Sequence, residues 1–252
     1  MNHIILTYKI IFSQLKKQIN NNIISLISGF LIVLLIRSIL AIMDTIFIPQ
    51  EFPFQRIVFI LTTALLIMGM EIGYTKFVFH IIDKKNKGVN SIFNYFHYLI
   101  HYLKGLCLYY FLLFLLFLPL FIFLFFNYEF EFFEMLFNSI NDPYFYELVA
   151  NYFNFQAIIM VFLLCFLPSI YIAIRLSFWS YFVIDKELSA LKSLKQSWFI
   201  TNTRSLEICF FALGLLLFNL LGAMILIGIC FTVPISYLFF CLYFRHLIAN
   251  QR

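Results

Sequence analysis

Few residues of this chain are of types that do chemistry, and the first candidates are two histidines one helical turn apart. His97 and His101 have the spacing at which two imidazoles on one helix can share a metal ion. A membrane zinc or di-iron enzyme needs further ligands, and the sequence has no second histidine pair and no His-Glu box. Nucleophile motifs of the Gly-x-Ser-x-Gly type, P-loops and Rossmann fingerprints are also absent from it. We therefore predict no metal site, no cofactor and no enzymatic activity.

Three ionisable residues fall inside long apolar runs, where a charge is costly and usually has a partner: Arg37, Glu71 and Arg175. Counted from the predicted span ends, Glu71 and Arg175 lie at similar depth, whereas Arg37 is about eight residues, roughly 12 Å, away along the axis. One expectation is an intramembrane ion pair between Glu71 and Arg175. The alternatives are that each side chain reaches the interface alone, where Arg175 would contact lipid phosphates, or that they belong to a transport pathway.

The segment from Ser177 to Arg204 is polar-rich and connects two apolar runs. Its apolar residues recur at spacings of three and four, which predicts an amphipathic helix lying on the membrane surface: Leu188, Leu191, Leu194 and Trp198. Lys192 and Lys195 lie between them, and Arg204 follows. We predict that Lys192, Lys195 and Arg204 contact anionic lipid headgroups, although such charges are also ordinary for a cytoplasmic loop.

Composition places the chain in a membrane. Of the 252 residues, 63% are hydrophobic and 12% are charged, whereas soluble domains carry roughly 25% charged residues. The net charge is +5, and the sequence has no run of five residues of like charge. This distribution favours basic cytoplasmic loops over nucleic-acid binding. The five cysteines lie in apolar runs without a Cys-x-x-Cys pair, so neither a disulfide framework nor a zinc site is expected.

Six apolar segments predict an all-α, polytopic integral membrane protein with one membrane domain over residues 1–252: 23–43, 57–80, 105–126, 155–184, 206–226 and 229–247. Residues 2–22 are predicted to form a further amphipathic interfacial helix ahead of the first span. Lys and Arg gather in the N-terminal segment, in 83–104, in 185–205 and at the C-terminus, whereas the acidic stretch 127–154 has none. By the positive-inside rule, both termini are cytoplasmic and the protein lies in the cytoplasmic (inner) membrane.

The second span contains Gly69 and Gly73, a pair of small residues four positions apart. This spacing lets another helix approach closely. Packing within the same bundle is favoured here over a dimer interface.

Two blocks of sequence give a family resemblance. The first runs from Gly69-x-x-x-Gly73-Tyr-Thr-Lys76 through the charged turn Asp83-Lys-Lys-Asn-Lys-Gly88. The second begins with Ser189-Ala-Leu-Lys-Ser-Leu-Lys-Gln-Ser-Trp198 and continues to Asn219-x-x-Gly222, Gly228, Thr232-x-Pro234 and Tyr243-x-Arg245. Together they resemble the six-span bacterial membrane proteins grouped with the membrane domain of glycerophosphoryl diester phosphodiesterases. Asn202-Thr203 stands where many members carry Lys-Gly. The 252 residues contain no phosphodiesterase catalytic domain, so the resemblance implies a membrane module without assigned chemistry.

These observations predict a non-enzymatic multi-pass membrane protein that interacts with membrane lipids, with another membrane protein or with a second copy of itself. A transporter or channel for a small solute is the alternative. It needs a polar path and often has internal repeats, whereas the spans offer few polar groups and no repeat is visible. An intramembrane enzyme ranks third, because paired carboxylates and ligand clusters are missing.

Overall fold

The computed structural model describes residues 2–47, 53–85, 87–127, 154–225 and 227–250, and the regular structure in these ranges is helical without a strand. Eight α-helices and one 3-10 helix, η1, follow one another in these ranges: α1 (Asn2–Phe47), α2 (Pro53–Ile82), η1 (Val89–Tyr98), α3 (Leu99–Asn127), α6 (Phe155–Arg175), α7 (Trp179–Lys186), α8 (Ala190–Ile200), α9 (Ser205–Met224) and α10 (Ile229–Ala249). The acidic stretch predicted between the third and fourth spans lies outside the described residues, apart from its two ends.

Six helical stretches of the described chain are long and apolar enough to cross a membrane: Tyr8–Met43, Phe54–Ile82, Val89–Asn127, Gln156–Lys186, Ser205–Met224 and Ile229–Ala249. Each overlaps one predicted span. Backbone polar groups in hydrocarbon must be bonded internally, which helices achieve within one segment. The prediction of an all-α, multi-pass membrane protein is confirmed at this level.

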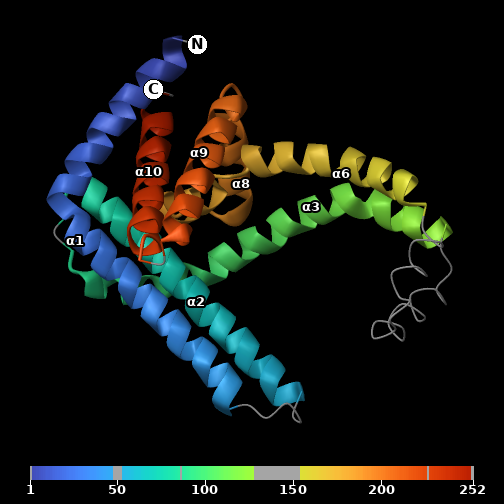
Figure 1. The fold of residues 1–252 in the computed structure, drawn as a ribbon, viewed down its shortest axis with the longest axis horizontal. Helices are drawn as coiled ribbons and strands as arrows, with labels where there is room; N and C mark the ends of the chain where they lie inside the picture. The colour runs from blue at the N-terminus through green and yellow to red at the C-terminus, as the bar shows by residue number, and fades with distance from the viewer. Residues whose placement is uncertain (1, 48–52, 86, 128–153, 226, 251–252) are drawn as a thin grey trace.

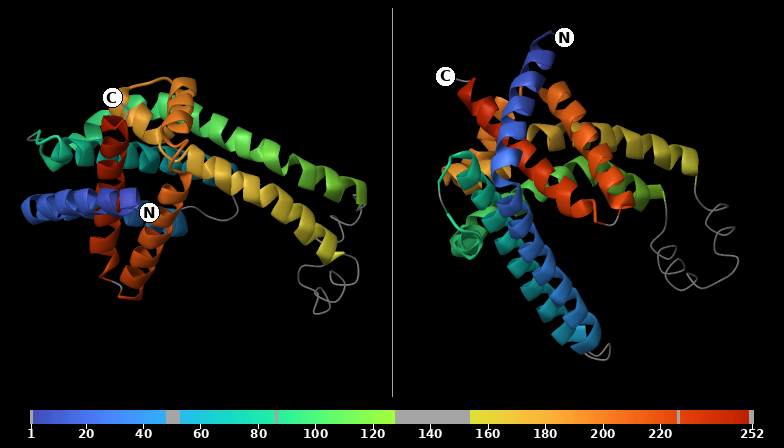
Figure 2. Two further views of the ribbon diagram at one scale, coloured as in Figure 1. Left: turned by 90° about the horizontal axis from the view of Figure 1, so that it is seen from above. Right: turned by 60° about the vertical axis from the view of Figure 1, so that its left-hand side comes forward.

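The long helices form hairpins that diverge from one end of the molecule. The pairs α1–α2 and α3–α6 each run side by side, and the two pairs spread apart like the arms of a V (Figures 1 and 2). The shorter hairpin α9–α10 stands where the arms meet, and both chain ends lie on the same side of the fold (Figure 1).

The buried core lies at the closed end of the V, and α10 runs through it. In its most apolar window 56% of α10 is buried, whereas none of the corresponding α3 window is. Phe178, Tyr243 and Phe244 are fully buried and their rings pack against one another or against Tyr181. The exposed apolar residues of the α3–α6 arm therefore suit contact with lipid chains.

Two predicted boundaries differ from the structure. The segment 2–22 is not a separate interfacial helix, because α1 continues through it to Phe47 and the sequence has neither glycine nor proline before Gly29. The predicted span 155–184 is interrupted after Arg175 by a turn at 176–178, and a separate helix, α7, begins at Trp179. No proline or glycine marks that turn, so the sequence pattern did not reveal it.

Gly69 and Gly73 bring η1 against α2. A Cβ atom at Gly69 would overlap the ring of Phe96, and one at Gly73 would overlap the carbonyl oxygen of Ile92. The element that approaches them is thus the 3-10 helix of the same chain, whose side chains at Ile92 and Tyr95 are buried. Both glycines hold the segment after the α2 turn close to the core.

Candidate functional site

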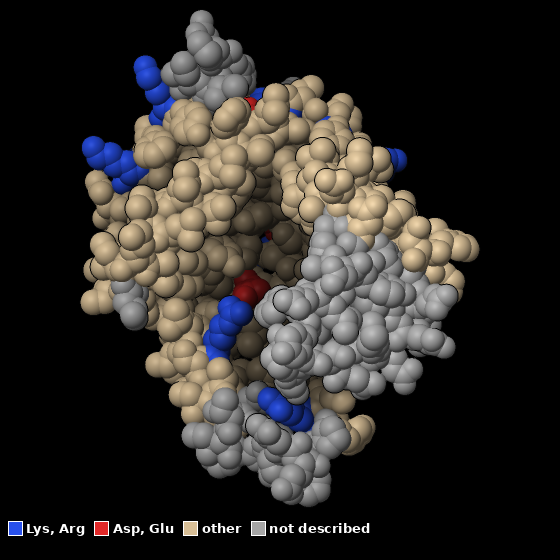
Figure 3. Space-filling model, turned by 45° about the vertical axis from the view of Figure 1, so that its right-hand side comes forward, with Lys and Arg blue, Asp and Glu red and all other residues tan. Residues whose placement is uncertain are grey.

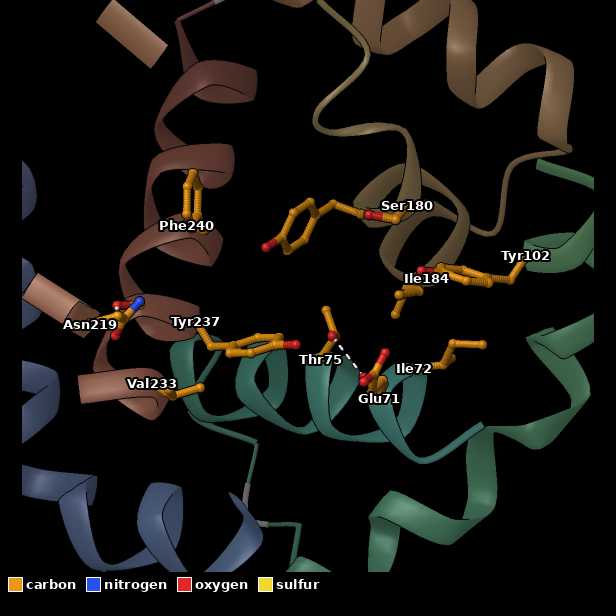
Figure 4. Close-up of a pocket in the computed structure, with 12 residues that line it drawn as sticks. Glu71, Ile72, Thr75, Tyr102, Ser180, Ile184, Asn219, Val233, Tyr237 and Phe240 are labelled. Atoms are coloured by element: carbon orange, nitrogen blue, oxygen red, sulfur yellow. Dashed lines mark hydrogen bonds between the residues drawn. The ribbon is translucent and has the colours of Figure 1, made fainter. Parts of the chain in front are cut away.

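A cavity of about 310 Å³ lies inside the bundle, where α2, α3, α7, α9 and α10 converge. Its apolar wall consists of Ile72, Ile184, Val233 and Phe240. Eight further residues contribute a carboxylate, an amide and hydroxyl groups: Glu71, Thr75, Tyr102, Ser180, Tyr181, Asn219, Ser236 and Tyr237. Figure 4 shows Glu71 and Thr75 rising from α2 toward Tyr237 on α10 and toward the end of α7. The volume is at the lower end of the range for small-molecule sites.

Polar contacts brace this cavity. The Ser236 hydroxyl donates to Asn219 Oδ1 over 3.1 Å, which ties α10 to α9. The Thr75 hydroxyl donates to the main-chain oxygen of Glu71 over 2.8 Å, not to its carboxylate. The carboxylate of Glu71 is therefore not engaged by its nearest hydroxyl along the helix, and 41% of its side chain is exposed.

Glu71 has a different charged neighbour from the one predicted. Arg37 Nη1 lies 3.8 Å from Glu71 Oε1, so the pairing of Glu71 with Arg175 is wrong. Side chains on a helix lean toward its N-terminus, and α1 and α2 are antiparallel, so Arg37 and Glu71 lean toward each other. This closes much of the axial separation counted from sequence. In the space-filling view a hollow opens beside uncharged residues, and basic and acidic atoms meet at its edge (Figure 3).

Arg175 is instead enclosed by the connector. Its side chain is 1% exposed, so it does not reach lipid phosphates. Arg175 Nη1 donates to Asn202 Oδ1 over 2.7 Å, and the guanidinium carbon lies 4.3 Å from the centre of the Trp198 ring. A desolvated guanidinium over an indole face is a favourable cation–π arrangement. Arg175 thus fastens the end of α6 to the residues around the end of α8.

The connector helix α8 buries a face that the sequence analysis did not single out. Leu194 is buried, but Leu191 and Trp198 are 69% and 41% exposed. The buried face also includes Ala190, Ser193, Ser197 and Ile200. Lys192 and Lys195 are exposed on the opposite face. Arg204 is half-buried.

Hydroxyl groups on and next to the buried face of α8 form hydrogen bonds with the main-chain groups that are left free between α6 and α7. The Ser197 hydroxyl donates to the Arg175 carbonyl over 3.1 Å and accepts from the Phe178 N–H over 3.1 Å. The Thr201 hydroxyl donates to the same carbonyl over 2.8 Å. Main-chain groups freed at a helix end need such partners. These bonds from α8 hold the turn between α6 and α7. The next helix, α7, carries Ser180 and Ile184 of the cavity.

A polar network at the closed end of the V was not anticipated. Arg245 of α10 donates to both carboxylate oxygens of Asp185, over 2.7 and 2.9 Å, and to Asp83 over 2.8 Å. Lys76 donates to the carbonyls of Ile184 and Asp185, over 2.9 and 3.3 Å, at the C-terminal end of α7. These bonds join α2, α7 and α10. A hint lay in the sequence: each of these helices carries a charge within six residues of its C-terminal end.

Comparisons with known proteins were made for the whole chain. No family model, no curated protein and no solved structure matches it. The resemblance to phosphodiesterase membrane domains stays a prediction.

Metal chemistry finds no support in the described part of the chain, which holds no group of three or more His, Cys, Asp or Glu side chains placed to bind an ion. His97 Nδ1 lies 3.2 Å from the carbonyl oxygen of Asn94, and His101 faces a groove between α3 and α8. The cavity around Glu71 offers hydrogen bonds and one carboxylate. Such a set of groups suits binding of a polar or amphipathic molecule.

Proposed function

We propose that this multi-pass membrane protein is non-enzymatic and binds a small amphipathic molecule from the membrane in the cavity beside Glu71. The support is a single feature: a carboxylate among hydroxyl and amide groups, in a cavity of about 310 Å³ between apolar spans. A charged group in such a setting usually serves binding or transport. The cavity is a different place from that of the headgroup contacts expected at Lys192, Lys195 and Arg204. We propose that the protein spans the cytoplasmic membrane and that both termini lie in the cytoplasm.

The head of the ligand is proposed to be an amine. A carboxylate accepts several hydrogen bonds, and Arg37 approaches Glu71 no closer than 3.8 Å. An ammonium group could approach to ordinary charge-assisted distance. Tyr102 and Tyr237 would surround it with aromatic faces and hydroxyls, and the apolar tail would leave between the diverging arms.

The test uses Trp179 as a reporter, because its ring lies 5.0 Å from that of the cavity residue Tyr102. In a Trp198→Phe background, Trp179 is the remaining tryptophan of the two in the sequence. The full chain in nanodiscs is titrated with 11-bromoundecylamine and with 11-bromoundecanol, whose bromine quenches indole fluorescence. We expect saturable quenching with the amine favoured by about tenfold, as for a charge-assisted hydrogen bond.

Two variants sharpen the test. Glu71→Gln should abolish the preference for the amine, and Arg37→Gln should increase it by removing the competing cation. Glu187→Gln is the matched control, because this carboxylate lies outside the cavity lining. Quenching that never saturates, or a preference that survives Glu71→Gln, would overturn the proposal.

Transport of a small solute is the second candidate, and the interruption between α6 and α7 favours it. Interrupted helices form the sites of many transporters, and α7 supplies Ser180, Tyr181 and Ile184 to the cavity. Uptake of ethylamine into proteoliposomes, measured with and without the protein, decides between binding and transport. Flux that requires Glu71 would establish transport.

A further inference from the structure

A second cavity, of about 320 Å³, opens at the closed end of the V between α1 and the turn that follows α2. Ten residues line it; four are lysines and none is acidic. It shares no lining residue with the cavity beside Glu71. The two cavities therefore offer opposite chemistry, since one presents a carboxylate and the other presents ammonium groups.

One wall of this basic cavity is a polar face of α1. Lys17, Asn21 and Ser25 follow one another at intervals of four, and Gln18 and Asn22 lie beside them. Residues four apart lie on one side of a helix. The Asn22 amide donates to Gln18 Oε1 over 2.9 Å, which orders this wall. Amide and hydroxyl groups supplement the lysine ammoniums as hydrogen-bond donors for an anion.

The other wall is the turn carrying Lys84, Lys85 and Lys87. Main-chain bonds from Lys85 N–H to His80 O (2.9 Å) and from Lys84 N–H to Ile81 O (3.1 Å) end α2 in a Schellman turn. Lys84 takes the left-handed position of that turn, with φ of 55°. Glycine is the residue that fits this backbone without strain, and strained residues cluster at binding sites. Here the strained residue contributes an ammonium group to the cavity.

The positive charges are not neutralised locally. None of the ion pairs among the described residues involves Lys17, Lys84 or Lys85. The acid nearest in sequence, Asp83, is already bonded to Arg245 over 2.8 Å. Converging like charges repel unless an anion joins them. Phosphate oxygens are strong acceptors for such a cluster.

The geometry points to a binding site for a phosphate ester, and specifically for the headgroup of an anionic phospholipid. From Lys17 and Asn21 the same side of α1 continues through Ile24, Leu31 and Leu35, which are 81%, 42% and 58% exposed. These positions follow at spacings of three, four and seven, so a polar end passes directly into an apolar stripe. A phosphate at the lysines would place its acyl chains along that stripe.

The experiment measures lipid binding by native mass spectrometry of the full chain in mild detergent. Dihexanoyl-phosphatidylglycerol is the probe, and glycerol phosphate is the soluble counterpart without acyl chains. The triple variant Lys17→Gln, Lys84→Gln and Lys85→Gln should weaken binding of the first phosphatidylglycerol molecule by about 100-fold, because each basic residue near an anionic lipid usually contributes about 1 kcal/mol. The control replaces Lys9, Lys16 and Lys104, three exposed lysines outside the cavity, with glutamine and should change affinity less than threefold.

A second variant separates binding from folding. Lys84→Gly relieves the left-handed backbone while removing one ammonium, so it should raise the melting temperature and still weaken phosphatidylglycerol binding. Lipid that binds at least tenfold more tightly than glycerol phosphate identifies a membrane source, and equal affinity identifies a soluble phosphate ester. Unchanged binding in the triple variant, or an equal loss in the control, would overturn the site.

Discussion

Individual charged residues in this protein find partners that sequence depth alone did not predict. Counting along straight spans separated Arg37 from Glu71 by roughly 12 Å and aligned Glu71 with Arg175. The lean of side chains toward each helix N-terminus brings Arg37 and Glu71 to 3.8 Å instead. Arg175 instead contacts Asn202 and Trp198. The need of each charge for a partner was predictable; the partner was not, because it depends on the relative placement of helices far apart in sequence.

Arg245 provides the residue-scale prediction. Its guanidinium binds Asp185 through two hydrogen bonds, and the Asp185 side chain is 8% exposed. Arg245→Gln leaves that carboxylate without its bidentate partner, and removing one member of a buried pair typically costs about 3–5 kcal/mol. We expect a large fall in the melting temperature of the detergent-solubilised protein. Arg245→Lys should restore only part of the lost melting temperature, because an ammonium group cannot form the two parallel hydrogen bonds that the planar guanidinium forms.

Lys186→Gln is the control for this variant. Lys186 also contacts Asp185, at 3.3 Å, but its side chain is 41% exposed. Exposed pairs contribute about 0–1 kcal/mol, so this change should shift melting little. Equal effects of the two substitutions would show that the pairing geometry of Arg245 is unimportant.

At the scale of elements, α8 shows what amphipathic periodicity leaves out. Leucines and Trp198 at spacings of three and four predicted a stripe that lies against the membrane, and in the structure Leu191 and Trp198 are exposed whereas Leu194 is buried within the protein. The face through Ser193 and Ser197 is buried because those hydroxyls contact main-chain atoms. An interrupted helix needs polar partners, and serine on a close-packed face supplies them. Hydropathy does not record that need, so the existence and basic outer face of α8 were predictable and its orientation was not.

Ser197 tests this role of α8. Ser197→Ala removes the acceptor of the Phe178 N–H and one of the donors to the Arg175 carbonyl. An unsatisfied buried main-chain group costs about 1–3 kcal/mol, and Thr201 still bonds the Arg175 carbonyl. We therefore expect a loss of stability in that range. In thermal melts, Ser189→Ala should be nearly neutral, because Ser189 is exposed at the start of the same helix and makes no capping bond. The idea fails if both alanines melt alike.

On the scale of the whole molecule, the apolar runs predicted six helical spans, and six stretches of the described chain meet that description. Their number and order follow from the requirement that backbone groups in hydrocarbon bond within a helix. The V-shaped spread of the two arms and both cavities were not predictable. Apolar helix faces in lipid resemble one another, and their pairing is decided by small residues and by scattered polar contacts. Gly69 and Gly73 pack against η1, a segment that lies outside the predicted spans.

Topology is the whole-molecule prediction. Both chain ends and α8 lie at the closed end of the V, whereas α3 ends at Asn127 at the tip of an arm (Figure 1). Lysines and arginines surround the closed end, and Asn127 leads into the acidic stretch. By the positive-inside rule, the closed end should be cytoplasmic. Single cysteines at the exposed positions Asn127, Lys195 and Lys16 report on this in a chain whose five natural cysteines are replaced by alanine. An impermeant maleimide added to intact cells should label Asn127→Cys, and should reach Lys195→Cys and Lys16→Cys only after the membrane is opened. Labelling of Asn127→Cys and Lys195→Cys from the same side would contradict the arrangement, since α6 and α7, which lie between these positions, would then not form one crossing of the bilayer.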